Sequence, residues 1–390
     1  MFVTRPRSLY RNFPSSLLDR PPPEAPYSGY MVVSDEESEE MDTCCWGICK
    51  NSRISRLPFP QDRILKVVHK SEHEQASVLK AWFIPVPGQP LSSNRYYVIK
   101  ARGFHKGRAY TCSREEDIET CCYNNVRVDL KPKPFDYRDL YQQVEIRPYE
   151  NGGFYAIPVA RNGFPPKFLS KRGWEVHTSH SFRLHLREAQ GLHTASLSDL
   201  PELDVALFSR RTSPVIIGKW YCPFVFVKER AKVKEQMKTS MFYELTLKQW
   251  WERIYSCDNE GDRSNVVVVN ACVRRLVTLI SGMEAEKEDR DDDNGFIWFK
   301  AKARYKKKAR VGLSSAIFEK MRWLQESRGW FDGGVEDVRV EGENEIKSEN
   351  GWRRFGCYVL VESFVLRRLD GSLLINFNFK NTNRFQCKCA

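Results

Sequence analysis

Residues 218–229, GKWYCPFVFVKE, form the densest apolar block of the chain, and Val215, Ile216 and Ile217 precede it. β-Branched and aromatic side chains dominate the block, which is typical of a strand buried on both faces. Pro223 has no backbone N–H for a ladder hydrogen bond, so we predict a bulge or break there. The block is shorter than the ~20 apolar residues of a membrane-spanning helix, and charged residues flank it, so we predict no transmembrane segment.

A second block near the C-terminus repeats this order of residues. Residues 355–362, FGCYVLVE, again run from an aromatic residue through a cysteine and an apolar run to an acid. We interpret the two blocks as central strands with similar roles. The second block opens a predicted hairpin, residues 355–369 with 372–379, because Asp370 and Gly371 form a strong two-residue turn signal.

The remaining pattern predicts a mixed fold. Between residues 61 and 187, short strand-like runs alternate with turn signals, which favours an antiparallel unit. Three helices are predicted later in the chain: 229–238, 247–255 after a capping box formed by Thr246 and Gln249, and 314–327. We therefore expect an α+β fold, mostly antiparallel β-sheet, with two or three helices in the C-terminal half.

Composition suggests three segments. Residues 1–60 read as an extended arm, first Pro-rich and then acidic. Residues 61–200 form the β-rich unit. Residues 214–390 form an α+β unit with charged loops at 284–310 and 336–349.

Charge points to an anionic partner. The 390 residues contain 62 Lys and Arg against 50 Asp and Glu, a formal net charge of +12. This excess favours nucleic acid, a membrane surface or an acidic protein. A hydrophobic content of 41% and an aromatic content of 13% exclude wholesale disorder.

Twelve cysteines are present, and the first twenty residues lack the apolar region of a secretory signal. We therefore expect a reducing compartment and mostly free thiols. Two adjacent pairs, Cys44 with Cys45 and Cys121 with Cys122, have three interpretations. They are buried small apolar residues, S-acylation sites beside basic residues, or a metal or redox site.

Two polar motifs suggest modification or transport. Ser34 precedes and Ser38 lies within an acidic run, 35–40, that suits an acid-directed kinase, and we expect that run to be a solvated loop. The basic residues Lys306, Lys307, Lys308 and Arg310 suit a nuclear-import patch, although neighbouring acids could simply pair with them.

Signatures of catalysis are missing from the sequence. It contains no Gly-rich phosphate loop, no Gly-x-Ser-x-Gly elbow and no His-Glu-x-x-His. His177, His180 and His185 are the one histidine cluster, and alternation along a strand would point His180 away from the other two. We therefore nominate no catalytic, cofactor-binding or metal-binding residue and expect no cofactor.

Several segments resemble a plant-specific family catalogued as a domain of unknown function, family 1262. These are residues 220–229, 237–246 and 355–368, together with 3–6, 21–23, 28–30 and 90–97. The resemblance extends over nearly the whole chain and implies no activity, cofactor or catalytic residue. Some members carry an insecticidal-crystal-toxin label, which implies a toxin-like protein by analogy only.

From these observations we expect a soluble, intracellular, non-enzymatic binding or interaction protein with an anionic or acidic partner. One alternative is a peripheral membrane protein, S-acylated or toxin-like. Another is a non-specific nucleic-acid binder. We expect a cytoplasmic location, with the nucleus or a membrane surface as alternatives. Arg5, Arg7 and Arg11 precede the first acid, Asp19, a weak feature of a transit peptide.

Overall fold

The structure is a computed structural model of the chain. It describes residues 1–20, 26–41, 43–44, 49–50, 52–71, 74–121, 124–127, 129–184, 186–193, 201–203, 209–259, 265–288, 295–302, 309–330, 337–346 and 352–389.

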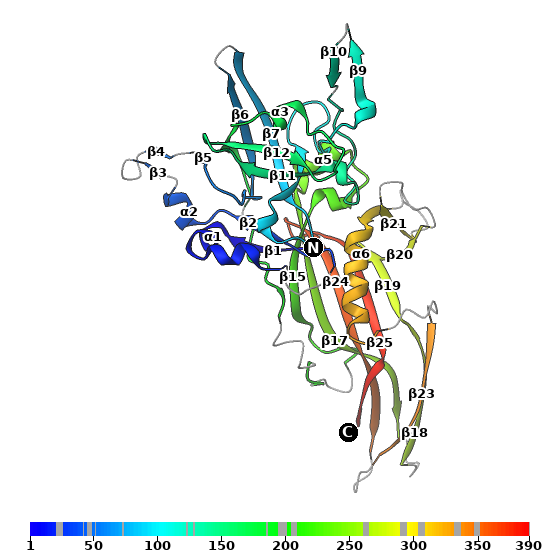
Figure 1. Cartoon of the computed structure of the whole chain (residues 1–390). Helices are drawn as coiled ribbons and strands as arrows, with labels where there is room; N and C mark the ends of the chain where they lie inside the picture. Colours follow the sequence, from blue (N-terminus) through cyan, green and yellow to red (C-terminus); the bar gives the residue numbers. More distant parts are fainter. Residues whose placement is uncertain are drawn as a thin grey trace.

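The larger of two main sheets runs through most of the molecule (Figure 1). Its strands, in spatial order, are β16 (Val227–Lys228), β22 (Arg310–Ser314), β21 (Phe296–Ala301), β20 (Met283–Lys287), β19 (Leu276–Ile280), β25 (Leu373–Cys389), β24 (Arg354–Arg368), β17 (Phe242–Asp258), β15 (Val215–Pro223), β1 (Phe2–Pro6) and β2 (Gly29–Val33), with β14 (Gly191–Leu192) paired to β15. Neighbouring strands are antiparallel except β1 and β2, which are parallel.

The second main sheet is built mostly from the first half of the chain. Its order is β12 (Phe154–Pro158), β11 (Gln143–Pro148), β8 (Arg95–Lys100), β7 (Glu74–Pro85), β6 (Arg63–Ser71), β13 (Glu175–Arg183) and β5 (Arg53–Ile54). Three two-stranded ribbons complete the described strands: β3 (Thr43–Cys44) with β4 (Cys49–Lys50), β9 (Ile118–Cys121) with β10 (Asn124–Arg127), and β18 (Val266–Arg274) with β23 (Asp337–Glu345).

Helices are few and short in the described part of the chain. They are α1 (Arg7–Asn12), α2 (Glu36–Met41), α3 (Lys167–Ser170), α5 (Val233–Thr239) and α6 (Ser315–Glu326), with the 3-10 turns η1 (Pro14–Leu18), η2 (Leu91–Ser93), η3 (Glu115–Asp117), η4 (Leu140–Gln142) and η5 (Phe224–Phe226). Strands make up 51% of the structure and helices 16%. The predicted α+β class is therefore wrong, and the fold is mostly β.

The largest single error is the helix predicted at 247–255, because those residues belong to β17. That strand pairs with β15 on one side and with β24 on the other, so it is a central strand of the sheet. Leu247, Trp250 and Trp251, which have helical spacing in the sequence, are buried there. The residues of the expected capping box form hydrogen bonds to the neighbouring strand β24 instead. Thr246 Oγ1 donates to the Val365 carbonyl at 3.5 Å, and Gln249 Nε2 donates to Glu362 Oε1 at 2.6 Å.

A second correction concerns residues 336–349, predicted to be a loop. Of these, Asp337–Glu345 form β23, which pairs with β18 along its length. Its acids occupy exposed alternate positions, while Val340 faces inward and is buried. The acidic side chains therefore lie on the solvent face of a strand. Side chains alternate between the two faces of a strand, so exposed acids are as compatible with a strand as with a loop.

Both predicted central strands are confirmed. β15 ends at Pro223, where η5 interrupts it, and both β15 and β24 have a strand on each side. The hairpin of β24 and β25 turns at the predicted residues, with Gly371 at a φ of +86°. Helix α6 is also confirmed and buries Ile317, Met321 and Leu324.

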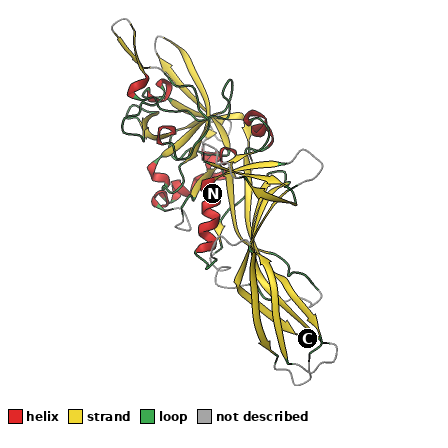
Figure 2. Ribbon diagram, turned by 90° about the vertical axis from the view of Figure 1, so that its right-hand side faces the viewer, coloured by secondary structure: helices red, strands yellow, loops and turns green. Residues whose placement is uncertain are grey.

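The molecule is elongated (Figures 1 and 2). The seven-stranded sheet lies at one end, and the long strands β17, β24 and β25 run toward the other, where the β18–β23 ribbon covers them. Each region has its own core: the main core beneath the large sheet, an aromatic core around Trp174 in the seven-stranded sheet, and a small core of Val267, Val269 and Phe355 under the ribbon.

Close backbone packing fixes one turn of the seven-stranded sheet and leads to a testable prediction. Gly153, between β11 and β12, has a φ of +78°, and a Cβ there would lie 2.7 Å from the backbone of Gly173 and Trp174. We expect Gly153→Ala to lower the free energy of unfolding by about 2–3 kcal/mol, because left-handed strain and overpacking add.

Gly88 provides the matched control for this substitution. It has the same φ of +78°, but no atom lies within 4 Å of the position that a Cβ would take. Gly88→Ala should therefore cost only the conformational part, about 1 kcal/mol. Urea denaturation of both variants measures the difference, and equal losses of stability would contradict the packing argument.

Candidate functional site

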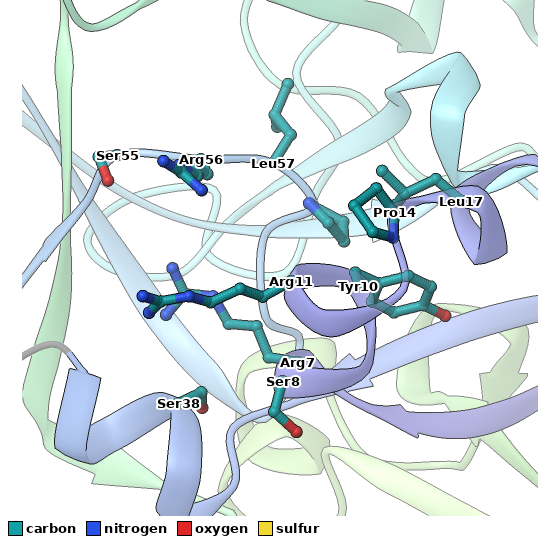
Figure 3. Close-up of a pocket in the computed structure, with 11 residues that line it drawn as sticks. Arg7, Ser8, Tyr10, Arg11, Pro14, Leu17, Ser38, Ser55, Arg56 and Leu57 are labelled. Carbon is teal, nitrogen blue, oxygen red and sulfur yellow. The ribbon is translucent and has the colours of Figure 1, made fainter.

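The candidate site is a pocket between α1, the start of η1 and the segment 55–58 that follows β5 (Figure 3). Its volume is about 420 Å³, within the usual range for small-molecule sites. The lining combines three arginines (Arg7, Arg11, Arg56), an apolar set (Tyr10, Pro14, Leu17, Leu57, Pro58) and three hydroxyls (Ser8, Ser38, Ser55).

Helix α1 supplies two of the arginines. Arg7 and Arg11 are four residues apart, so both side chains leave the same side of the helix. Figure 3 shows them extending in the same direction. Two contacts hold α1 in place: the Ser8 N–H donates to Asp35 Oδ1 at 3.3 Å, and the Tyr10 side chain is buried. Burial also raises the pKa of Tyr10.

The opposite wall supplies the third arginine. Arg56 is exposed, whereas Pro58 and Phe59 are buried, and Phe59 belongs to the core of the seven-stranded sheet. The short segment is thus anchored at its C-terminal end. Arg56 and Leu57 line the cavity, and Leu57 also packs against that core. The pocket therefore brings together residues that are about 45 positions apart in the chain.

Charge in the lining has one sign. The described residues that line the cavity include three arginines and no Asp or Glu. On the adjacent α2, Glu37 accepts a hydrogen bond from Asn12 at 3.0 Å, and Glu39 pairs with Arg63 at 2.7 Å. Guanidinium groups bind phosphate and carboxylate oxygens through paired hydrogen bonds. The arrangement therefore suits an anionic group attached to an apolar body.

The lining does not assemble a catalytic group. Its serine hydroxyls are those of Ser8, Ser38 and Ser55, and no His, Cys or carboxylate is present among the described lining residues to act as their base. Across the described part of the chain, no group of three or more His, Cys, Asp or Glu is placed to hold a metal ion. His177 contacts Glu175 at 3.2 Å and Ser52 at 3.3 Å.

Among the predicted modification sites whose side chains the structure describes, Ser38 lines the pocket and Ser34 does not. The acidic run that contains Ser38 forms α2, not the expected solvated loop. Ser38 is 6% exposed, and its Oγ donates to the Asp35 carbonyl at 3.0 Å. Ser34 Oγ donates to Asp62 Oδ1 at 3.3 Å, and burial raises the pKa of Asp62. Phosphorylation of Ser34 and Ser38 stays a prediction, and in this conformation both hydroxyls are already bonded.

The other predicted sites lie elsewhere or outside the described residues. Arg310 is bonded to Glu288 at 2.6 Å and lies 4.1 Å from the centre of the Trp298 ring, so the alternative of local pairing accounts for it. Lys306, Lys307 and Lys308 lie outside the described residues. So do Cys45 and Cys122, and of Cys44 and Cys121 only the backbone is placed, in β3 and β9. The acylation, redox and import interpretations stay predictions.

Comparison with known proteins finds a family for part of the chain, and the description of that family names no activity. Residues 24–123 match the model of a family described as "Protein of unknown function (DUF1262)". The predicted resemblance is thereby confirmed for this part of the chain, which includes Ser38 and the 55–58 wall of the pocket. No curated protein matches the chain.

Among solved structures, the crystal structure of Cry35Ab1 is similar with a TM-score of 0.47 and 11% sequence identity, covering 85% of this chain and 90% of that chain. We take no function from this likeness. Among the described helices, none has the length and apolar character needed to cross a membrane.

Proposed function

We propose that the protein is a soluble, non-enzymatic binding protein whose pocket between α1 and residues 55–58 holds a ligand with a phosphate or carboxylate head and an apolar body. The observation that carries the proposal is the lining itself: Arg7, Arg11 and Arg56 share one cavity with Tyr10, Leu17 and Leu57. The net charge of +12 favours the same class of ligand.

The proposal is tested by calorimetric titration with three probes that separate the two parts of the ligand. Hexyl phosphate carries both a head and an apolar body, inorganic phosphate carries only the head, and hexanol carries only the body. We expect hexyl phosphate to bind at least tenfold more tightly than either of the others, because charge-assisted hydrogen bonds and apolar burial both contribute.

Variants locate the binding. Replacing Arg7, Arg11 or Arg56 by Gln should weaken hexyl phosphate binding at least tenfold each, since a hydrogen bond to a charged group contributes about 1.5–3 kcal/mol and about 1.4 kcal/mol is a factor of ten. Arg161→Gln is the matched control, because Arg161 is exposed and does not line the pocket. Failure of hexyl phosphate to bind, or binding that the three substitutions leave unchanged, would overturn the proposal.

A second candidate function, attachment to a membrane surface, is favoured by apolar side chains beside the same pocket. Phe13 is 60% exposed and Leu18 is 70% exposed, and their sequence neighbours Pro14 and Leu17 line the cavity. Arginines next to exposed apolar side chains suit an anionic lipid. If this is correct, Phe13→Glu with Leu18→Glu should abolish co-sedimentation with phosphatidic acid vesicles while hexyl phosphate binding persists. Nucleic-acid binding stays a prediction from net charge.

A further inference from the structure

Two cysteines face each other across the β24–β25 ladder. Cys357 on β24 is the direct register partner of Cys387 on β25. Cys387 lies near the C-terminal end of β25, and that end of the strand lies at the far end of the molecule from the seven-stranded sheet (Figure 1). The pair belongs to neither the pocket nor the cysteine pairs that the sequence singles out.

Register alone brings these residues into the range of a disulfide. Direct partners on antiparallel strands have Cα atoms about 4.5–5.5 Å apart and side chains on the same face. A disulfide needs Cα atoms about 4.4–6.8 Å apart. The backbone therefore requires little or no movement for the two sulfurs to bond.

The two thiols differ in environment. Cys387 is exposed, whereas Cys357 is fully buried at 0% exposure. The hydrogen bond from the Cys357 thiol holds the pKa of Cys387 below its usual range. The same hydrogen bond and burial raise the pKa of Cys357. The exposed sulfur is thus the better nucleophile, and the protonated partner lies beside it.

We propose that Cys387 and Cys357 are a peroxide-sensitive pair, in which exposed Cys387 is oxidised and buried Cys357 resolves it to a disulfide between β24 and β25. This pair functions independently of the ligand pocket.

The chemistry balances with a hydroperoxide as the oxidant. The Cys387 thiolate attacks the O–O bond of hydrogen peroxide and forms a sulfenic acid, while the departing hydroxide takes up a proton as water. The Cys357 sulfur then attacks the sulfenic sulfur, the S–O bond breaks, and a second water leaves with the Cys357 proton. Two thiols lose two electrons to one peroxide, and a dithiol reductant reverses the change.

The disulfide would tie an edge segment of the sheet to its neighbouring strand. β19 pairs with β25 only between Ile375 and Phe379, so farther along β25 the ladder partner is β24. Residues 385–387 of β25 are exposed. A covalent link at Cys387 would hold this end of the strand against the central strand β24 and suppress its fraying.

The test is peptide mapping of the full chain after reduction, exposure to hydrogen peroxide, unfolding and alkylation. We expect a peptide cross-linked through Cys357 and Cys387, lost thiols that dithiothreitol restores, and slower hydrogen exchange at the distal end of β25. Cys387 should react at least tenfold faster than Cys389, which is also exposed but lies opposite Phe355.

Serine variants identify which cysteines form the cross-link. Cys389→Ser should leave the cross-link intact, and Cys387→Ser should abolish it. Cys357→Ser should leave Cys387 as a sulfenic acid that dimedone traps. Recovery of Cys357 as an alkylated thiol from peroxide-treated wild-type protein, whether Cys387 is unmodified or further oxidised, would overturn the proposal.

Discussion

Lys320→Met is expected to stabilise the protein by about 4 kcal/mol at pH 6.5, since a pKa change of one corresponds to about 1.4 kcal/mol. Lys320 lies on α6 with 0% of its surface exposed, and its Nζ has no hydrogen-bond partner among the residues that the structure describes. Burial lowers the pKa of Lys320 from 10.5 to about 7. A contact with the Trp323 ring, 5.4 Å from Nζ, offsets only part of this cost.

The sign of the pH dependence follows from the lowered pKa. Between about pH 7 and pH 10.5 the unfolded chain binds the Lys320 proton and the folded chain does not, so this lysine makes stability rise with pH across that window. Below pH 7 the folded protein carries the full cost of a buried charge. The advantage of Lys320→Met should therefore be largest below pH 7 and shrink steadily as the pH approaches 10.5.

Urea denaturation of both proteins at pH 6.5 and pH 9.5 measures this. The difference in the free energy of unfolding between the two proteins cancels the contributions of the tyrosines and cysteines, which titrate in both. Lys234→Met is the control, because the Lys234 side chain on α5 is exposed and its loss should change stability by less than about 0.5 kcal/mol. A stability gain that is the same at both pH values would show that Lys320 is not a buried, titrating amine.

Glu362→Ala is expected to destabilise the protein by about 3–5 kcal/mol. Glu362 on β24 is 3% exposed and pairs with Arg328, which follows α6 and is 12% exposed. It also accepts a hydrogen bond from Gln249 of β17. Removing the carboxylate leaves the Arg328 charge buried without this partner and loosens the attachment of α6 to the sheet.

The double variant Arg328→Met with Glu362→Leu distinguishes the contribution of the ion pair from that of side-chain packing. Replacing both charges with apolar side chains removes the buried, unpaired charge, so we expect at least half of the lost stability to return. Thermal and urea denaturation compare the double variant with its two single variants, Arg328→Met and Glu362→Leu. If the double variant is as unstable as the sum of its single variants, the loss comes from packing and not from the ion pair.

Sequence reasoning succeeded where local signals and tertiary structure agree. The strand ending at Pro223, the turn at Asp370 and Gly371, and the helix that buries Ile317 and Met321 all follow from patterns within a few residues. It failed at residues 247–255, where apolar spacing and a capping box fit a helix but two neighbouring strands impose a sheet. Pairing partners more than 100 residues away, such as Val365 for Thr246, are not visible in a local window.

The candidate site was missed for a similar reason. Arg7 and Arg11 have the i, i+4 spacing of one helical face, a signal that was available, but nothing local connects them to Arg56. Only the fold of the seven-stranded sheet, with Phe59 anchored in its core, brings that third arginine to α1. The cysteines show the same effect, since the register between β24 and β25 selects Cys357 and Cys387 from twelve.

The long ladder between β17 and β24 also determines how the molecule responds to mechanical force. Their register runs without a change of partner strand from Tyr243 with Arg368 to Asp258 with Arg354. A pull along these strands loads all the hydrogen bonds of the ladder together, in shear, whereas a pull at right angles would open them one after another. We therefore expect this part of the large sheet to resist tension along its strands more than tension across them.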